Sequence, residues 1–194
     1  MKNVNTNFLA RPNPEKPGER YNGQGWGFLD PNNDSVYSCW KIIQQQVNPT
    51  NILEIGFFAG HSATTMLNIW PQSKLISYDP GSFARTSYIK VSERFGKRFE
   101  FRPYAINEYP VIPTNIDLMF IDGSHRYDKV KIDIEYAKKI KPKYLLFDNV
   151  ELHEVRKAIK ESGYMNEEMN PQYLFYTCNH KGICAPGILL LLKI

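Results

Sequence analysis

The chain has 194 residues, of which 42% are hydrophobic and 13% aromatic, and this composition predicts one globular domain with a sizeable core. Its net charge of +4 comes from Lys and Arg spread along the sequence, so a nucleic-acid partner is allowed but not favoured. The sequence has no signal-peptide pattern, no apolar run near the ~20 residues that span a bilayer, and three cysteines without disulfide-framework spacing, which together predict a cytoplasmic protein with no membrane partner.

Residues 1–34 differ in composition from the rest of the chain. They are rich in Asn, Pro and Gly, and Tyr21, Trp26 and Phe28 stand among glycines. Such a segment is either a flexible tail or a lid whose aromatic side chains fold over a bound ligand. Residues 35–194 are expected to form the folded domain, which opens with a helix before the first strand.

The rest of the chain alternates between segments of strand and helix character. Five apolar runs have strand length, in the order NILEIG, KLISYD, RFEFRP, IDLMFID and YLLFDN. Two sets of apolar residues recur at helical spacing, namely Tyr127, Val130, Ile134 and Ala137, and then Leu152, Val155 and Ile159. This alternation predicts βαβ units and a parallel sheet covered by helices on both faces.

Two later runs, QYLFYTC and GILLLLKI, predict an antiparallel hairpin that closes the sheet. The predicted fold class is therefore α/β, with a seven-stranded, mostly parallel sheet and a C-terminal antiparallel hairpin. The turn between the two runs contains Cys178, His180 and Cys184, which form either a zinc clip or an ordinary hairpin turn. The hairpin turn is favoured because a structural zinc normally takes four ligands and no fourth is evident.

Oxygen-bearing side chains follow two of the predicted strands. The run IDLMFID ends on Asp122, and YLLFDN ends on Asp148 and Asn149. If these strands are neighbours, at a spacing of about 4.8 Å, the three side chains converge above one edge of the sheet. Two carboxylates that close repel one another unless a cation lies between them. The pattern therefore predicts a site for a hard divalent metal.

A second motif follows the first strand. In LEIGFFAGHSA, Glu54, Gly56 and Gly60 form an ExGxxxG turn from strand to helix, where the backbone can approach a ligand. Phe58 occupies the place of the second glycine in a nicotinamide fingerprint, which argues against a bound pyrophosphate. The next strand ends in Asp79, which either accepts hydrogen bonds from ribose hydroxyls or serves as a turn residue.

Four segments in this order, EIGFFAGHSA, ISYDP, FIDGSHRYD and LLFDNV, resemble the class I S-adenosylmethionine-dependent methyltransferases, and among them the metal-dependent O-methyltransferases. Catechol and caffeoyl-CoA O-methyltransferases share the turn with a central aromatic residue and the Asp-Asn pair at a strand end. The Asp-x-x-His arrangement is similar to that of macrolide-sugar O-methyltransferases. The resemblance implies a Rossmann-like fold.

The resemblance also implies roles for individual residues. Those expected to bind S-adenosylmethionine are Glu54, Gly56, Phe57, Gly60 and Ser62 at the methionine part, Asp79 at the ribose, Ala105 and Ile106 at the adenine, and Asp122 at the strand edge. The implied ligands of Mg²⁺, or of another divalent cation, are Asp122, Asp148 and Asn149. His125 is the implied general base, and His153 is a rival candidate without the motif context. The lysine of catechol-type enzymes has no obvious counterpart.

These observations predict an enzyme that transfers a methyl group from S-adenosylmethionine to a hydroxyl of a small molecule, either a sugar or a vicinal diol of catechol type. One alternative is a metal-independent methyltransferase of the same fold, although the (N/D)PP(Y/F) motif of base amino methylation is absent. Another is a non-catalytic protein that binds S-adenosylmethionine. His125 itself is either the base or a surface residue that caps a helix. A homo-oligomer is compatible with the sequence.

Overall fold

The computed structural model describes residues 11–12, 20–21, 40, 42–81, 84–108, 111–164, 173–177 and 187–194. Within residues 1–34 it describes only a short antiparallel pair, β1 (Arg11–Pro12) and β2 (Arg20–Tyr21). The predicted lid and the turn with Cys178 and Cys184 lie outside the described residues. In the described part of the chain, no helix is long and apolar enough to cross a bilayer.

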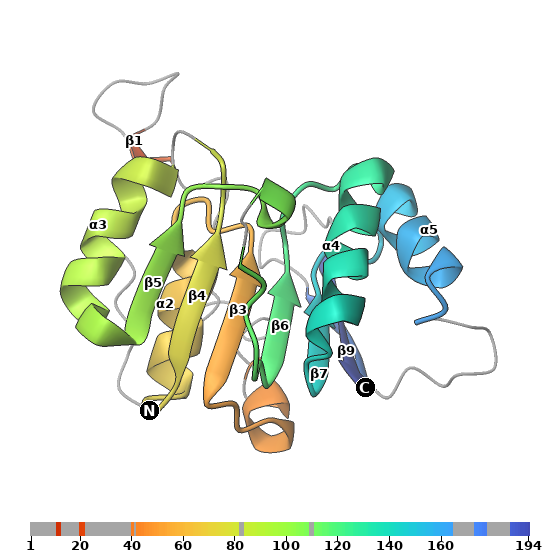
Figure 1. Cartoon of the computed structure of the whole chain (residues 1–194), viewed down its shortest axis with the longest axis horizontal. Coiled ribbons are helices and arrows are strands. Elements are labelled where there is room, and N and C mark those ends of the chain that lie inside the picture. Colours follow the sequence, from red (N-terminus) through yellow and green to blue (C-terminus); the bar gives the residue numbers. More distant parts are fainter. Residues whose placement is uncertain are drawn as a thin grey trace.

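The central sheet has seven strands in the order β5-β4-β3-β6-β7-β9-β8 (Figure 1). The first five in the sequence are mutually parallel: β3 (Asn51–Ile55), β4 (Lys74–Tyr78), β5 (Phe99–Arg102), β6 (Leu118–Ile121) and β7 (Tyr144–Phe147). The last two, β8 (Tyr173–Thr177) and β9 (Gly187–Lys193), pair in antiparallel fashion with each other, and β9 also pairs with β7. The predicted α/β class with a C-terminal hairpin is confirmed.

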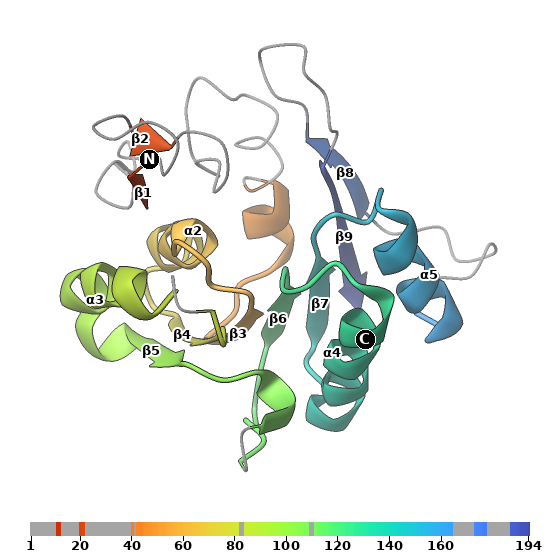
Figure 2. The same cartoon turned by 90° about the horizontal axis from the view of Figure 1, so that it is seen from above.

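Helices cover both faces of the sheet. Helices α2 (His61–Ile69) and α3 (Ala84–Phe95) lie on one face, and α4 (Tyr127–Ile140) and α5 (His153–Glu161) lie on the other (Figure 2). Two short 3-10 helices, η2 (Gly96–Arg98) and η3 (Ile106–Glu108), flank β5, and residues 42–46 are helical before β3. Helix α3 begins at Ala84, within the segment PGSFARTSY that follows β4.

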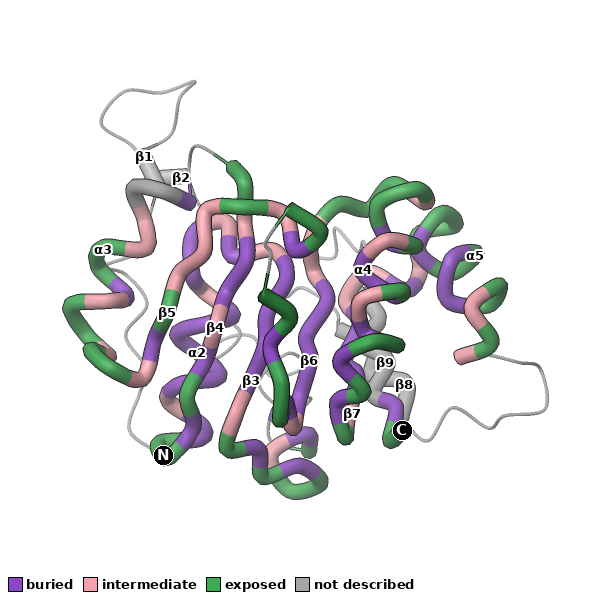
Figure 3. Tube along the Cα trace, viewed as in Figure 1, coloured by how far each residue is buried: buried purple, intermediate pink, exposed green. Residues whose placement is uncertain are grey.

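The core consists of two apolar layers, one on each side of the sheet. The central strands are largely buried, as their purple colour in Figure 3 shows. Successive side chains of a strand point to opposite faces. Leu118 and Phe120 of β6 therefore pack in the layer beneath α2, whereas Met119 and Ile121 pack beneath α4. Burial on both faces explains why these strands read as continuous apolar runs.

The predicted buried face of α4 is confirmed, because Val130, Ile134 and Ala137 are buried and Tyr127 packs against them. The prediction for α5 holds for Val155 and Ile159 but not for Leu152, which is 38% exposed. Leu152 is the residue before the first turn of α5 and has extended backbone angles, so its side chain does not continue the helical face.

The order of the strands decides where the site lies. From β3 the chain builds the sheet outward through β4 and β5, and it then returns to place β6 on the other side of β3. Ligands of open α/β sheets bind at the carboxyl ends of the strands at such a switch point. The neighbouring strands β6 and β7 align Ile121 with Phe147, so Asp122 and Asp148 follow at the same edge.

Candidate active site

The turn after β3 has an unusual backbone. Gly56 and Gly60 have positive φ angles of 94° and 81°, and Phe58 between them has a φ of 45°. Gly60 caps the start of α2, and a side chain there would collide with the ring of Phe57. Phe57 is buried and its ring stacks on Phe99 at 5.4 Å between centroids. The side chain of Phe57 therefore belongs to the core, and its predicted contact with the cofactor stays a prediction.

Gly56 is required by the fold itself. A Cβ atom at this position would lie 1.9 Å from the carbonyl oxygen of Asp122 and 2.8 Å from the Cα of Gly123. We expected the missing side chain to let a ligand approach the backbone. The glycine also lets the ends of β3 and β6 approach one another, so a substitution here would perturb the sheet, and the approach of a ligand stays a prediction.

Glu54 lies beneath the turn and has no exposed surface. Its two carboxyl oxygens accept hydrogen bonds from the hydroxyls of Ser62 on α2 and Ser77 on β4. Burial raises the pKa of Glu54 to about 8, although the two hydroxyls oppose this effect. Glu54 and Ser62 are therefore bonded to each other beneath the turn, and their contact with the cofactor stays a prediction.

Asp79, at the end of β4, holds the turn from the side. Its Oδ2 accepts a hydrogen bond from the backbone N–H of Phe58 at 2.7 Å, and its Oδ1 accepts one from the N–H of Gly81 at 2.7 Å. The turn interpretation of Asp79 is thereby confirmed. A carboxylate has further acceptor capacity, so the same residue can still bind a ribose hydroxyl, and that role stays a prediction.

The predicted adenine border lies after β5. Ile106 begins η3 and its side chain is buried in the layer beneath α4, whereas Ala105 is partly exposed. Helix α4 contacts η3, since the hydroxyl of Tyr136 donates a hydrogen bond to the carbonyl oxygen of Asn107 at 3.5 Å. The segment is thus attached to the same helix that leaves the Asp122 strand end.

Asp122, Asp148 and Asn149 come together at the ends of β6 and β7. The backbone N–H of Asp148 donates to the carbonyl oxygen of Ile121 at 3.1 Å, which continues the strand pairing to this point. Burial, and then the charge of Asp122, raises the pKa of Asp148 well above its ordinary value. Asn149 has a φ of 55°, and its side-chain amide donates to Glu151 at 3.2 Å.

Sequence reasoning missed Glu151. Its charge contributes to raising the pKa of both Asp148 and His125, so it lies within the electrostatic reach of the acidic pair. It follows the Asp-Asn pair without any spacing that marks a ligand, and no signal in the sequence singles it out. Three acidic side chains therefore act on this edge of the sheet.

Asp122, Asp148 and Asn149 are the residues expected to hold a metal ion. Among the described residues, no three His, Cys, Asp or Glu side chains are close enough to form a metal centre by themselves. Two partly buried carboxylates, of which Asp122 raises the pKa of Asp148 by its charge, with an amide oxygen beside them, are nevertheless the hard oxygen donors that Mg²⁺ takes when water and substrate complete its shell. The residues fit a partly open divalent site.

His125 lies beside the acidic pair. Its Nε2 is 3.7 Å from Oδ1 of Asp122, and its side chain is 47% exposed. The polar contact with Asp122 raises the pKa of His125, against the opposing effect of partial burial. A general base has to be neutral to accept a proton, whereas Asp122 favours the charged form of this imidazole. His153, the rival base, begins α5 and is exposed.

A second histidine at the turn was not anticipated. His61 is the first residue of α2, and its Nδ1 is buried without a hydrogen-bond partner in the described structure. Burial lowers its pKa to about 4, so the ring is neutral at neutral pH. Its place in the GHSA part of the turn was the only sequence signal for it.

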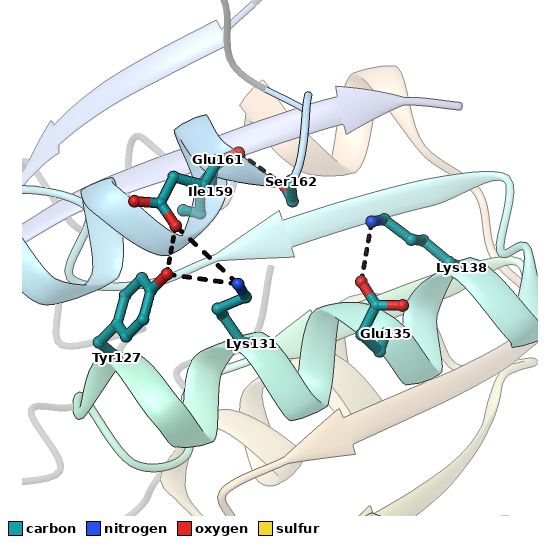
Figure 4. Close-up of polar contacts among 7 residues, drawn as sticks. All are labelled: Tyr127, Lys131, Glu135, Lys138, Ile159, Glu161 and Ser162. Atoms are coloured by element: carbon teal, nitrogen blue, oxygen red, sulfur yellow. Dashed lines mark hydrogen bonds and ion pairs between the residues drawn. The ribbon is translucent and has the colours of Figure 1, made fainter.

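Contacts between α4 and α5 hold the two loops of the site in place (Figure 4). The hydroxyl of Tyr127 donates to Glu161, and Lys131 Nζ donates to the same hydroxyl at 3.3 Å. The backbone N–H of Tyr127, at the start of α4, donates to Glu154 Oε2 on α5 at 3.0 Å. Because Asp122 precedes α4 and Asp148 precedes α5, these contacts link the two strand ends.

The glycine turn, the acidic strand ends and the Rossmann-like sheet are those of a class I methyltransferase fold. Residues 53–150, about half of the chain, match the protein family described as "Methyltransferase domain". The chain therefore belongs to this methyltransferase family. Comparison with curated protein sequences finds no match.

Solved structures share the fold at low sequence identity. The O-methyltransferase TomG from Streptomyces achromogenes, solved with S-adenosylmethionine, is 19% identical with a TM-score of 0.60 over 79% of this chain and 76% of that chain. An O-methyltransferase from Bacillus cereus is 18% identical with a TM-score of 0.60 over 87% and 84%. The N-methyltransferase NodS from Bradyrhizobium japonicum is 15% identical with a TM-score of 0.58 over 86% and 98%. At these identities the likeness shows the fold alone.

Proposed function

We propose that this protein transfers a methyl group from S-adenosylmethionine to a hydroxyl of a small molecule, and that the reaction depends on a divalent cation such as Mg²⁺. The observation that carries the proposal is the convergence of Asp122, Asp148 and His125 at the strand edge beside the glycine turn. The favoured acceptor is a sugar or a vicinal diol of catechol type, because two adjacent hydroxyls can chelate one cation.

The cofactor would lie across the ends of β3 and β4. The backbone of the turn from Gly56 to Gly60 would face its methionine part, and Asp79 would accept hydrogen bonds from its ribose. Ala105 and Ile106 would border its adenine. Two features support this arrangement. The first N–H groups of α2 have no side-chain cap, and the hydrogen bond from the N–H of Phe58 to Asp79 fixes the turn and the Asp79 carboxylate relative to each other before a ligand arrives.

Asp122, Asp148 and the amide oxygen of Asn149 would hold the cation. When bound, S-adenosylmethionine supplies a methyl group on a sulfonium that is left as a thioether, and the cation lowers the pKa of the accepting hydroxyl. The chain contributes position, because the carboxylates and His125 belong to loops that are fixed by β6, β7 and the α4–α5 contacts.

His125 would take the proton of the accepting hydroxyl at Nε2. In the structure this nitrogen faces Asp122, whose charge favours the protonated ring and so opposes that role. His125 can accept a proton only when it is neutral. Activity should therefore fall on acidification, as the imidazole becomes charged.

Two experiments test the proposal. Titration calorimetry with S-adenosylmethionine, in Mg²⁺ and in EDTA, measures binding. Transfer of a labelled methyl group to sugars and catechols, under the same two conditions, measures turnover. We expect binding in both conditions and turnover with Mg²⁺ alone. Full turnover in EDTA would favour a metal-independent methyltransferase, binding without turnover on any acceptor would favour a non-catalytic protein, and absence of binding would refute the proposal.

We also propose a cytoplasmic location, on the basis of the cysteine pattern and the expected cofactor. A homo-oligomer would be compatible with the exposed apolar side chains Val111 and Ile112, which lie before β6. Sedimentation of the purified protein measures its oligomeric state directly.

A further inference from the structure

Glu151 lies two residues after Asn149 and contacts it directly. Its carboxyl group is partly exposed, and its Oε1 accepts a hydrogen bond from the side-chain amide of Asn149 at 3.2 Å. Among the described residues, no three His, Cys, Asp or Glu side chains are close enough to form a metal centre. Glu151 is therefore not placed as a third carboxylate ligand beside Asp122 and Asp148, and its contact with Asn149 calls for another explanation.

This hydrogen bond decides which end of the Asn149 amide turns away from Glu151. The oxygen and the NH₂ group of an amide have nearly the same shape, but only the oxygen can bind a cation. A carboxylate only accepts hydrogen bonds, so Glu151 can hold the NH₂ group and not the oxygen. In the described part of the chain, Oδ1 of Asn149 accepts no hydrogen bond, which leaves this oxygen for a cation.

The backbone around this amide is held by hydrogen bonds of its own. The N–H of Asn149 donates to Oδ1 of Asp148 at 2.7 Å, and the carbonyl oxygen of Asn149 accepts from the N–H of Leu152 at 3.0 Å. Val150 is completely buried, and its carbonyl oxygen accepts from Nε of Arg156 at 3.1 Å. The side-chain amide is therefore the part of this loop that can still rotate, and only a contact with the amide itself can fix its direction.

We propose that Glu151 is a positioning residue for the divalent cation, which orients the Asn149 amide so that its oxygen and not its NH₂ group faces the ion. The inference rests on the metal dependence of the proposed function. Groups that orient the ligands of a metal typically contribute about 10- to 100-fold to its affinity. An acid that only stabilised the start of α5, two residues further along, would leave the metal affinity unchanged.

The test measures the binding of Mn²⁺ alone, through the electron paramagnetic resonance signal of the free ion, so it requires neither cofactor nor turnover. The proteins are the wild type, Glu151→Ala and the control Asp128→Ala, which removes an exposed acid that pairs with Arg126 at the start of α4. We expect Glu151→Ala to weaken Mn²⁺ binding about 10- to 100-fold. The control should change it less than about threefold, because solvent and salt screen an exposed charge.

A second comparison repeats Glu151→Ala in an Asn149→Asp background. A carboxylate presents an oxygen to the cation whichever way it is turned, so it needs no neighbour to orient it. We expect Asn149→Asp to bind Mn²⁺, and we expect the further replacement of Glu151 to weaken this binding less than about threefold, since the two positions are then no longer coupled.

The results that would overturn the inference can be told apart. Unchanged Mn²⁺ affinity in Glu151→Ala, with a native circular dichroism spectrum, would refute it and leave the proposed function intact. Equal losses of affinity in the two backgrounds would also refute it, because Glu151 would then act by its charge and not through the amide. Absence of Mn²⁺ binding by the wild type would refute this inference together with the metal dependence of the proposed function.

Discussion

The buried carboxyl group of Glu54 should make the stability of the protein depend on pH. Burial raises its pKa from 4.5 to about 8, whereas the unfolded chain exposes the group to water. Between these pH values the folded state holds a proton that the unfolded state has released. The free energy of unfolding therefore falls as the pH rises, by about 1.4 kcal/mol per pH unit and by about 5 kcal/mol over the whole interval.

The groups that face Glu54 come from each neighbouring element. Ser62 of α2 and Ser77 of β4 donate hydrogen bonds and oppose the rise in pKa, while the charges of Asp122 and Asp79 at the strand ends increase it. A Glu54→Gln substitution keeps the shape and removes the titration. Other buried acids remain in both proteins, so their contribution cancels when the two are compared.

The assay unfolds the wild type and Glu54→Gln in urea and monitors unfolding by circular dichroism. It is repeated at several pH values from about pH 5 to about pH 8, in EDTA and without cofactor. The stability of the wild type relative to the variant should decrease by about 1.4 kcal/mol for each pH unit across this range. A difference that stays constant with pH, or that increases with it, would show that Glu54 is ionised in the folded protein and would refute the reasoning.

Three further predictions concern other parts of the molecule. His125→Ala should reduce turnover about 10²- to 10⁴-fold while cofactor binding by calorimetry stays unchanged, and a loss of less than about threefold would exclude it as the base. Gly56→Ala should prevent normal folding, seen as a large drop in melting temperature, because its Cβ would lie 1.9 Å from the carbonyl oxygen of Asp122; a native melting curve would contradict this. Arg98→Met should destabilise the protein by about 1–3 kcal/mol, because the guanidinium donates to three carbonyl oxygens at and after the end of α2. The control Lys97→Met, at the neighbouring position, should change stability by less than about 0.5 kcal/mol. Equal effects of the two substitutions in urea unfolding would refute the capping role of Arg98.

Some features of the site could be predicted because they depend on local pattern. A strand ends where an apolar run meets polar residues, and Asp122, Asp148 and Asn149 stand at such points. The glycines of the turn could be recognised because few other residues adopt positive φ angles. For Gly56 the structure adds a requirement that the sequence did not reveal, because a side chain there would collide with the backbone that follows β6.

Other features depend on contacts between distant parts of the chain. Phe57 and Phe58 are adjacent and chemically alike, yet one ring lies in the core while the other residue gives its N–H to Asp79, 21 positions away. The raised pKa of His125 comes from its contact with Asp122, and that of Asp148 comes first from burial and then from the charge of Asp122 on the neighbouring strand end. None of these contacts produces a periodic pattern of residues that could be recognised in the sequence.

The amino-acid sequence by itself determined the alternation of strands and helices, their buried faces and the polar residues at the strand ends, because side-chain periodicity follows directly from backbone geometry. The tertiary structure alone decided which strand ends meet, which way Phe57 points and which acids, among them Glu54 and Asp133, lose contact with water. Burial and electrostatic interactions depend on distances through space, and these exist only once the sheet has assembled in its order.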